Sequence, residues 1–315
     1  MIHALSTAVL TCLGLSLLSC NPANLPGSGG PFSSDIYAGT ASGVSVSLTD
    51  GTSWSSIGSL PNVYSIVAVS SGTFVSLYAG TNTGLYLSTD GQTWPTMLLS
   101  GQGQVNDIFV LGTSIYAATT AGAWVYNGTT GGTPYSTAVL GVGSVGQGIY
   151  FDGTNIYVAT NGGLSVSSNS GATWTAYTTV LPSTNVLSVF DDGTNVYVGT
   201  DAGIAESPNA SLPAWTTTAT YTISSGLASN TVYGVFVSGG VIYAATAAGL
   251  SVFNGTTWTT YLQGTVVYGV SVSGTDIYLA TATGVWISLN SGASWSNYTT
   301  SQGLASNNVR SISVQ

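Results

Sequence analysis

Charged side chains are scarce in this sequence, and basic ones are nearly absent. Only 3% of the 315 residues are charged, and one Lys or Arg stands against ten Asp and Glu. The formal net charge is therefore −9 at pH 7. Nucleic-acid binding relies on clustered Lys and Arg side chains that neutralise phosphates. The composition excludes nucleic acid as a partner.

Cysteines and long apolar runs are also few. Cys12 and Cys20 are the only cysteines, too few for a disulfide framework. Mean hydropathy is +0.37, yet no run of about 18 apolar residues, the minimum for a membrane-spanning helix, follows Cys20. The apolar residues instead alternate with Ser, Thr, Gly and Asn, the period of half-buried strands. The sequence therefore predicts an all-β domain with an uncharged polar surface.

The N-terminal segment indicates export and anchoring. Residues 1–19 contain a short apolar stretch that ends in small residues, as a secretory signal does. Leu17-Leu-Ser-Cys20 resembles a bacterial lipobox, in which the cysteine is lipidated and becomes the mature N-terminus. Residues 20–34 are rich in Pro and Gly and suit a flexible tether. We predict a lipoprotein signal peptide over residues 1–19 and a lipid-anchored protein of the cell envelope.

The resemblance implies membrane attachment through the Cys20 lipid only, at the outer membrane or cell surface, with the periplasm as a further option. The segment Met1-Ile-His3 departs from the pattern because it has no Lys or Arg. An ordinary secretory signal with a chance cysteine is the alternative.

A sevenfold internal repeat follows the tether. The pattern Tyr-x-x-Thr-x-x-Gly returns about every 40 residues, a spacing typical of four-stranded propeller blades. Its tyrosines are Tyr37, Tyr78, Tyr116, Tyr157, Tyr197, Tyr243 and Tyr278. All units except the third also contain a later tryptophan: Trp54, Trp94, Trp174, Trp215, Trp258 and Trp295. We expect the tyrosines and tryptophans to pack between blades.

The ends of the chain predict how the ring closes. Apolar strands precede the tyrosine of every unit but the first, at residues 63–69, 105–111, 145–151, 186–192, 232–238 and 267–273. The first unit has no such strand, whereas residues 309–315 form an apolar strand with no unit after it. The C-terminal strand then completes the first blade and removes an exposed sheet edge. Residues 35–315 are predicted to form a seven-bladed β-propeller with four-stranded blades.

Two sets of motifs carry a family resemblance. Gly226-Leu-Ala-Ser-Asn230 and Gly303-Leu-Ala-Ser-Asn307 each precede an apolar strand. Together with the repeat, they resemble the two-component-regulator propeller repeat of periplasmic sensor domains. Ser167-Ser-Asn-Ser-Gly-Ala-Thr-Trp174 and Ser288-Leu-Asn-Ser-Gly-Ala-Ser-Trp295 resemble Asp-box (BNR-type) repeats, and Ser88-Thr-Asp-Gly-Gln-Thr-Trp94 is one residue short of that pattern. The resemblance implies the propeller fold but no single activity, because propellers host many unrelated functions.

The residues for catalysis are sparse. Asp-box propellers include sialidases, which bind the substrate carboxylate with three arginines, and this chain has Arg310 alone. Without His and Lys in the mature chain, acid–base chemistry would fall to carboxylates, and most of these lie beside expected turns. A converging pair such as Asp107 with Asp201 would be needed for a polysaccharide hydrolase or lyase. We predict a non-enzyme and keep that hydrolase as the alternative.

No metal or cofactor is expected. Zinc prefers Cys and His, which the mature domain lacks. The segment Asp191-Asp-Gly-Thr-Asn195 could offer some oxygen ligands to calcium, but a hairpin turn explains it as well.

One face of the propeller is the predicted binding surface. The Thr-x-x-Gly loops and the loops that enter each first strand share this face in a propeller of this strand order. Its candidate residues are Asn82, Asn161, Asp201, Asn230 and Asn307, joined by Trp124 and Trp286 because these tryptophans lie outside the repeated position. An uncharged Ser, Thr and Asn surface suits a protein or neutral polysaccharide of the envelope, or self-association.

We therefore expect a non-catalytic binding or scaffolding module. A factor for assembling envelope complexes is a further alternative. It ranks last because the photosystem assembly factors that it resembles recognise their client through an arginine patch, and this chain has a single arginine.

Overall fold

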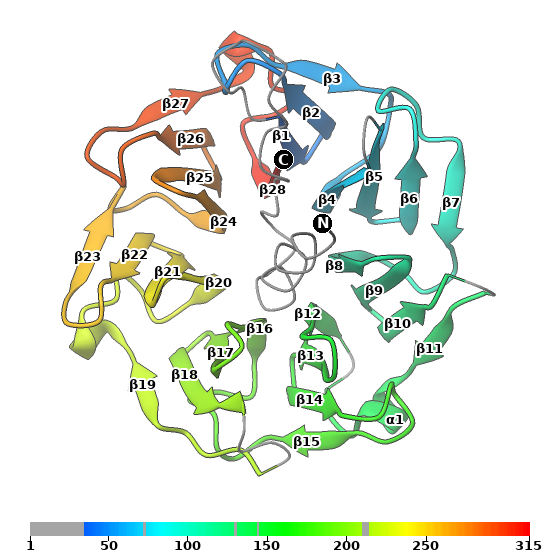
Figure 1. Ribbon diagram of the computed structural model, residues 1–315, viewed down its shortest axis with the longest axis vertical. Helices are drawn as coiled ribbons and strands as arrows, with labels where there is room; N and C mark the ends of the chain where they lie inside the picture. Colours follow the sequence, from blue (N-terminus) through cyan, green and yellow to red (C-terminus); the bar gives the residue numbers. More distant parts are fainter. Residues whose placement is uncertain (1–34, 72–73, 129–130, 144, 210–213) are drawn as a thin grey trace, which may run out of the picture.

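The computed structural model describes residues 35–71, 74–128, 131–143, 145–209 and 214–315. The predicted signal peptide, the lipidation site Cys20 and the tether lie outside these residues and stay predictions. Seven four-stranded antiparallel sheets stand around a central axis like the blades of a propeller (Figure 1). Among the described residues, no helix has the length and apolarity needed to cross a membrane.

Each blade has one strand at each of four radial positions. The inner strands are β28 (Val309–Val314), β4 (Val63–Ser71), β8 (Val105–Leu111), β12 (Gly146–Phe151), β16 (Val186–Asp191), β20 (Val232–Ser238) and β24 (Val267–Ser273). The second strands are β1 (Ile36–Thr40), β5 (Phe74–Thr81), β9 (Ser114–Thr119), β13 (Ile156–Thr160), β17 (Asn195–Thr200), β21 (Val241–Thr246) and β25 (Asp276–Thr281). The blades are numbered 1 to 7 in these orders.

The third strands are β2 (Gly43–Ser47), β6 (Leu85–Ser88), β10 (Gly122–Tyr126), β14 (Gly163–Ser167), β18 (Gly203–Pro208), β22 (Gly249–Phe253) and β26 (Gly284–Ser288). The outer strands are β3 (Ser55–Ile57), β7 (Thr96–Leu99), β11 (Thr133–Tyr135), β15 (Thr175–Tyr177), β19 (Ala219–Tyr221), β23 (Trp258–Tyr261) and β27 (Ser296–Tyr298). Within the part of the chain that the structure describes, the elements include three short helices: α1 (Thr137–Leu140), η2 (Ile223–Ser225) and η3 (Thr300–Gln302).

Ring closure follows the predicted scheme. The C-terminal strand β28 pairs with β1 from Ile36↔Val314 onward, so blade 1 combines the two ends of the domain. The N–H of Gln315 donates to the carbonyl of Asp35 at 3.0 Å. The expected limits of β8, β20 and β24 are exact, and those of the other four inner strands differ by one or two residues at one end, with β4 running on to Ser71. The predicted seven-bladed architecture is confirmed.

The repeated Thr-x-x-Gly motif forms the turn between second and third strands. In blade 5 the Thr200 hydroxyl donates to the carbonyl of Gly203 at 2.8 Å and accepts the N–H of Ala202 at 3.0 Å. Gly203 has φ +124°, and a Cβ there would collide with the carbonyl of Tyr221. Only glycine enters this region freely. The motif is therefore a structural device that positions the loops of one face.

The aromatic residues fill the seams between blades, as expected. The last residue of one outer strand packs on the tryptophan of the next blade, as Tyr177 does on Trp215 with ring centroids 5.8 Å apart. In blade 3, which has no tryptophan at that position, Tyr135 still packs edge-on against Trp174 of blade 4. Deeper in the seams, Tyr157 and Tyr278 are almost fully buried.

Candidate functional site

The seven inner strands give the central channel a repeating wall. Each begins with Val or Gly, followed by a variable residue, then Ser, Gly or Asp, then Ile or Val. The variable residues form one ring at the end of the channel where the inner strands begin, which we call the channel mouth: Tyr64, Asn106, Gln147, Leu187, Tyr233, Tyr268 and Arg310. The next ring is Ser65, Asp107, Gly148, Ser188, Gly234, Gly269 and Ser311. A bulge in most inner strands at these two positions turns the variable side chains toward the axis.

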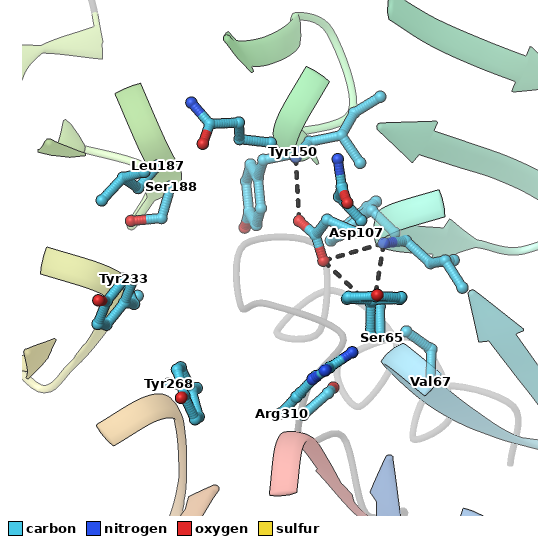
Figure 2. A pocket seen from close by; sticks show the side chains of 18 of the residues that line it. Ser65, Val67, Asp107, Tyr150, Leu187, Ser188, Tyr233, Tyr268 and Arg310 are labelled. Atoms are coloured by element: carbon cyan, nitrogen blue, oxygen red, sulfur yellow. Dashed lines mark hydrogen bonds between the residues drawn. The ribbon is translucent and has the colours of Figure 1, made fainter. Parts of the chain in front are cut away.

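All seven variable side chains line one cavity of about 230 Å³ (Figure 2). Two of them form hydrogen bonds to the backbone of the next blade. The Asn106 amide donates to the carbonyl of Gly146 at 2.7 Å, and the Gln147 amide donates to that of Val186 at 2.9 Å. These amides join blade 3 to blade 4 and blade 4 to blade 5.

Leu187, three tyrosines and one arginine remain for a ligand. Tyr233 and Tyr268 lie on neighbouring blades with ring centroids 5.5 Å apart and an interplanar angle of 52°. On the next two blades, the Arg310 guanidinium carbon lies 4.2 Å from the centre of the Tyr64 ring, a cation–π contact. Figure 2 shows Tyr233 and Tyr268 on one side of the cavity, with the Arg310 side chain leaning away from them toward Ser65 and Asp107. Arg310 is the only Lys or Arg of the whole chain.

Asp107 is the one acid in this lining. One carboxylate oxygen accepts from the N–H of Ile108 at 2.9 Å and the Ser65 hydroxyl at 3.3 Å. The other accepts from the N–H of Ile149 at 3.0 Å. Burial raises the pKa of Asp107 to about 6, against the lowering effect of these three donors. Asp107 thus joins blades 2, 3 and 4 around the channel.

An acidic cluster lies at the opposite end of the channel, near the turns between inner and second strands. The Tyr157 hydroxyl is 2.8 Å from Asp152 and 3.0 Å from Asp191. The hydroxyl can donate its one proton to only one of the two carboxyl groups. A proton on the other carboxyl group lets that group donate to the hydroxyl oxygen, so both contacts become hydrogen bonds. Burial raises the pKa of Asp191 to about 7, whereas hydrogen bonds, chiefly from Asn155, lower that of Asp152 below its usual value despite its burial. Asp191 is only 2% exposed.

The asparagines and the aspartate predicted for the binding face lie on loops of the channel-mouth side, whereas the two predicted tryptophans lie in strands β10 and β26. Several of the loop residues have structural partners. Asn161 accepts the N–H of Val145 at 3.1 Å, and Asp201 accepts the Asn185 amide at 3.0 Å. Asn82 is exposed.

The two Gly-Leu-Ala-Ser-Asn segments are built alike. Asn230 accepts the N–H of Ile223 at 2.8 Å, and Asn307 accepts that of Thr300 at 2.7 Å. Each asparagine therefore holds a turn that follows a short helix.

The two tryptophans chosen for contact differ in exposure. Trp124 is only 5% exposed and stacks on Tyr126, so it offers little surface to a partner. Trp286 is half-buried, and its indole donates to Thr283 at 3.4 Å.

Asp107 and Asp201 are not brought together as a carboxylate pair. Asp107 is in the channel wall and Asp201 is on an exposed loop, and they share no hydrogen-bond partner. The described residues contain no group of three or more His, Cys, Asp or Glu side chains placed to hold a metal ion.

The channel-mouth residues Tyr64, Tyr233, Tyr268 and Arg310 were not among the sequence candidates. The sequence did contain a signal for them. When the seven inner strands are aligned on the Ser, Gly or Asp that precedes Ile or Val, the residue before this pair varies among aromatic, amide, aliphatic and basic types. Where one position varies in an otherwise uniform repeat, its side chains are not fixed by the common fold, and this position is a candidate for ligand contact.

No protein-family model and no curated protein matches the chain. Among solved structures, the extracellular domain of a protein assigned as a hybrid two component system from B. thetaiotaomicron matches with a TM-score of 0.65 and 19% identity. That match covers 79% of this chain and 36% of the other, so this chain spans little more than a third of that neighbour's length.

Two further structures match over most of their own lengths. The WD40 propeller domain of Doa1 has a TM-score of 0.63 and 12% identity, over 78% of this chain and 86% of that one. A protein assigned as a 6-phosphogluconolactonase from Bacteroides uniformis has a TM-score of 0.62 and 12% identity, over 90% and 99%. With its seven four-stranded sheets, the chain therefore shares the β-propeller fold of extracellular sensor domains and WD40 domains.

Proposed function

We propose that this protein is a non-catalytic binding module of the cell envelope that holds its ligand at the channel mouth. The observation that carries the proposal is the ring of variable side chains at equivalent positions of the seven inner strands, which converge on one cavity. Four of these residues, Tyr64, Tyr233, Tyr268 and Arg310, line it with aromatic rings or a cation. Small-molecule sites combine such apolar walls with a few polar groups.

The cell-envelope setting rests on the lipobox-like segment at Cys20 and on the likeness to an extracellular domain. The ligand is a small molecule or the projecting part of a larger envelope protein or glycan, because the cavity of about 230 Å³ is slightly below the usual range of about 300–1,000 Å³.

Binding to immobilised envelope glycans and envelope proteins tests this proposal. The variant Tyr233→Ala/Tyr268→Ala should lose most of the binding shown by the wild-type domain. Thr194→Ala, in an exposed turn at the opposite end of the channel, is the matched control and should bind normally. Binding that survives the tyrosine double substitution would remove the channel mouth from consideration.

The second candidate is the carboxylate-dependent hydrolase. The specific observation in its favour is the Asp152–Tyr157–Asp191 cluster, where one carboxyl pKa is raised and the other lowered, as in many acid–base pairs. A cavity of about 370 Å³ lies beside Asp191. Against it, the Asp191 side chain is buried and fully hydrogen-bonded. Turnover of a polysaccharide that Asp191→Asn abolishes would establish this function in place of the first.

A further inference from the structure

We propose that the channel mouth recognises a carboxylate, and that the ligand is a small sugar acid of the hexuronate type bound through Arg310. This inference rests on the proposed function, because it names the ligand class of the same cavity. Three features carry it: an arginine without an acidic partner, aromatic rings that line the same cavity, and the size and charge of the surroundings.

Arg310 is a cation that the protein leaves unpaired. Its Nη1 atom is shielded from solvent and has no hydrogen-bond acceptor, and no ion pair joins Arg310 to an acid within the described part of the chain. A shielded donor without a partner costs free energy, and more so when it is charged. Ten Asp and Glu residues accompany this single base, yet none is placed against it.

The acid in the same lining is not its counter-ion. Asp107 gives its two oxygens to Ser65, Ile108 and Ile149, and Arg310 is not among the groups that shift its pKa. The Tyr64 ring beneath the guanidinium fixes the plane of Arg310 by the cation–π contact. A guanidinium held in one plane presents parallel N–H groups that match the two oxygens of a carboxylate.

The rest of the cavity favours a sugar ring on that carboxylate. Tyr268 and Tyr233, on the first and second blades beside that of Arg310, line the same cavity with aromatic rings, and the C–H groups of a pyranose stack on aromatic faces. The cavity of about 230 Å³ suits one sugar residue better than a chain. A polyanion is disfavoured, because a net charge of −9 repels many like charges whereas a single carboxylate meets Arg310 directly.

Calorimetric titration of the full domain with glucuronate, galacturonate, glucose and glucuronamide tests the inference. Glucuronamide is the matched neutral ligand, because it replaces only the carboxylate by an amide. At least one uronate should bind the wild-type protein about tenfold or more tighter than the two neutral ligands, as expected for a charge-assisted contact. Arg310→Gln should remove this preference.

Arg310→Lys tests the geometry, since it keeps the charge and loses the paired N–H groups, and it should recover only part of the uronate affinity. Thr194→Ala should match the wild type. Far-ultraviolet circular dichroism of each variant shows that the β-sheet structure is retained.

The outcomes separate this inference from the proposed function. Equal binding of uronate and glucuronamide, or unchanged uronate binding by Arg310→Gln, overturns the carboxylate assignment while the channel mouth remains a binding site. A short peptide with a free C-terminal carboxylate that binds better than either uronate overturns the sugar assignment. If no uronate binds, the inference fails, and the tyrosine double variant then decides independently whether the channel mouth binds a partner.

Discussion

At the scale of single residues, Asp107 occupies a position whose side chain, in several blades, accepts a backbone N–H of the next blade. On β28 the Ser311 hydroxyl accepts the N–H of Ile66 at 3.1 Å, and on β4 the Ser65 hydroxyl accepts the N–H of Ile108 at 3.2 Å. Asp107 accepts the N–H of the next blade in the same way. The carboxylate thus replaces a serine in a structural bond, and its burial raises its pKa.

The raised pKa values of Asp107 and Asp191, about 6 and about 7, predict a protein that is more stable in mild acid. Both lie above the usual 3.8, so the folded state binds more protons than the unfolded chain between about pH 4 and pH 7. Their contribution to stability is complete below about pH 4 and is lost as the pH rises through 7. Asp152 and Asp90 have lowered pKa values and act in the opposite sense, so their contribution is lost below about pH 4.

Urea unfolding between pH 4 and pH 8 measures this dependence. The urea midpoint should be highest near pH 4 to 5 and should fall toward pH 8. Asp191→Asn should flatten the upper part of that profile, because the amide does not titrate. A wild-type midpoint that rises steadily from pH 5 to pH 8 would show that these carboxyl groups are not buried as described.

Thr200 tests whether the repeat motif is structural. Thr200→Val keeps the shape of the side chain but leaves the buried carbonyl of Gly203 and the N–H of Ala202 without that partner. We expect a loss of about 1–3 kcal/mol in the free energy of unfolding. Thr194→Val, in an exposed turn, is the control and should change stability by less than about 0.5 kcal/mol. Equal effects of the two substitutions would contradict the role assigned to the motif.

At the scale of elements, strand β28 holds the two ends of the domain together. Besides its ladder with β1, it contacts β4 through side chains: the Ser313 hydroxyl accepts the N–H of Ala68 at 3.1 Å, and Gln315 exchanges hydrogen bonds with Ala68 and Ser70. The C-terminal strand therefore links blade 1 to blade 2.

Deletion of residues 309–315 should damage the whole ring. It exposes the hydrogen-bonding edge of β1 and the flank of β4, and unpaired edges promote association. Size-exclusion chromatography should show aggregates, and thermal unfolding should lose cooperativity. Ser70→Ala, which removes one exposed hydrogen bond to Gln315, is the mild control and should remain a monodisperse, stable protein.

The sequence predicted the elements better than the site. Blade number and closure follow from local patterns, namely the Tyr-x-x-Thr-x-x-Gly turns and an offset of one strand between the chain ends. To predict the channel-mouth residues, one must know which side of a bulged strand each side chain faces. The bulge between Val63 and Ser65 interrupts the regular alternation of side chains between the two faces of the strand. That Arg310 lacks an acidic partner is a matter of three-dimensional placement, which no spacing reveals.

The same limit applies to the predicted binding-face residues. Asn230 and Asn307 lie on the expected face, but their side chains bind backbone of their own loops, a contact that the motif alone did not disclose.

At the scale of the whole molecule, charge is dominated by one sign. Ten acids and one Lys or Arg leave a net −9 that destabilises a compact state through self-repulsion. Raising NaCl from about 10 mM to about 0.5 M screens this repulsion and should increase the midpoint of thermal unfolding by a few degrees. The same series in sucrose controls for effects that are not electrostatic. A midpoint that falls with salt would mean that ion-specific effects outweigh repulsion.

The contact between Gln315 and Asp35 has a consequence for how the chain can be connected. These residues meet where the other six blades have the hairpin that joins an inner strand to a second strand. A short Asn-Gly linker at this point would supply the missing hairpin and turn the domain into a continuous circle. Such a circle could be reopened at the exposed Gly153 or Gly193 turn and still encode all seven blades. The chain could thus begin in a different blade, while the cyclic order of the blades around the axis stays the same.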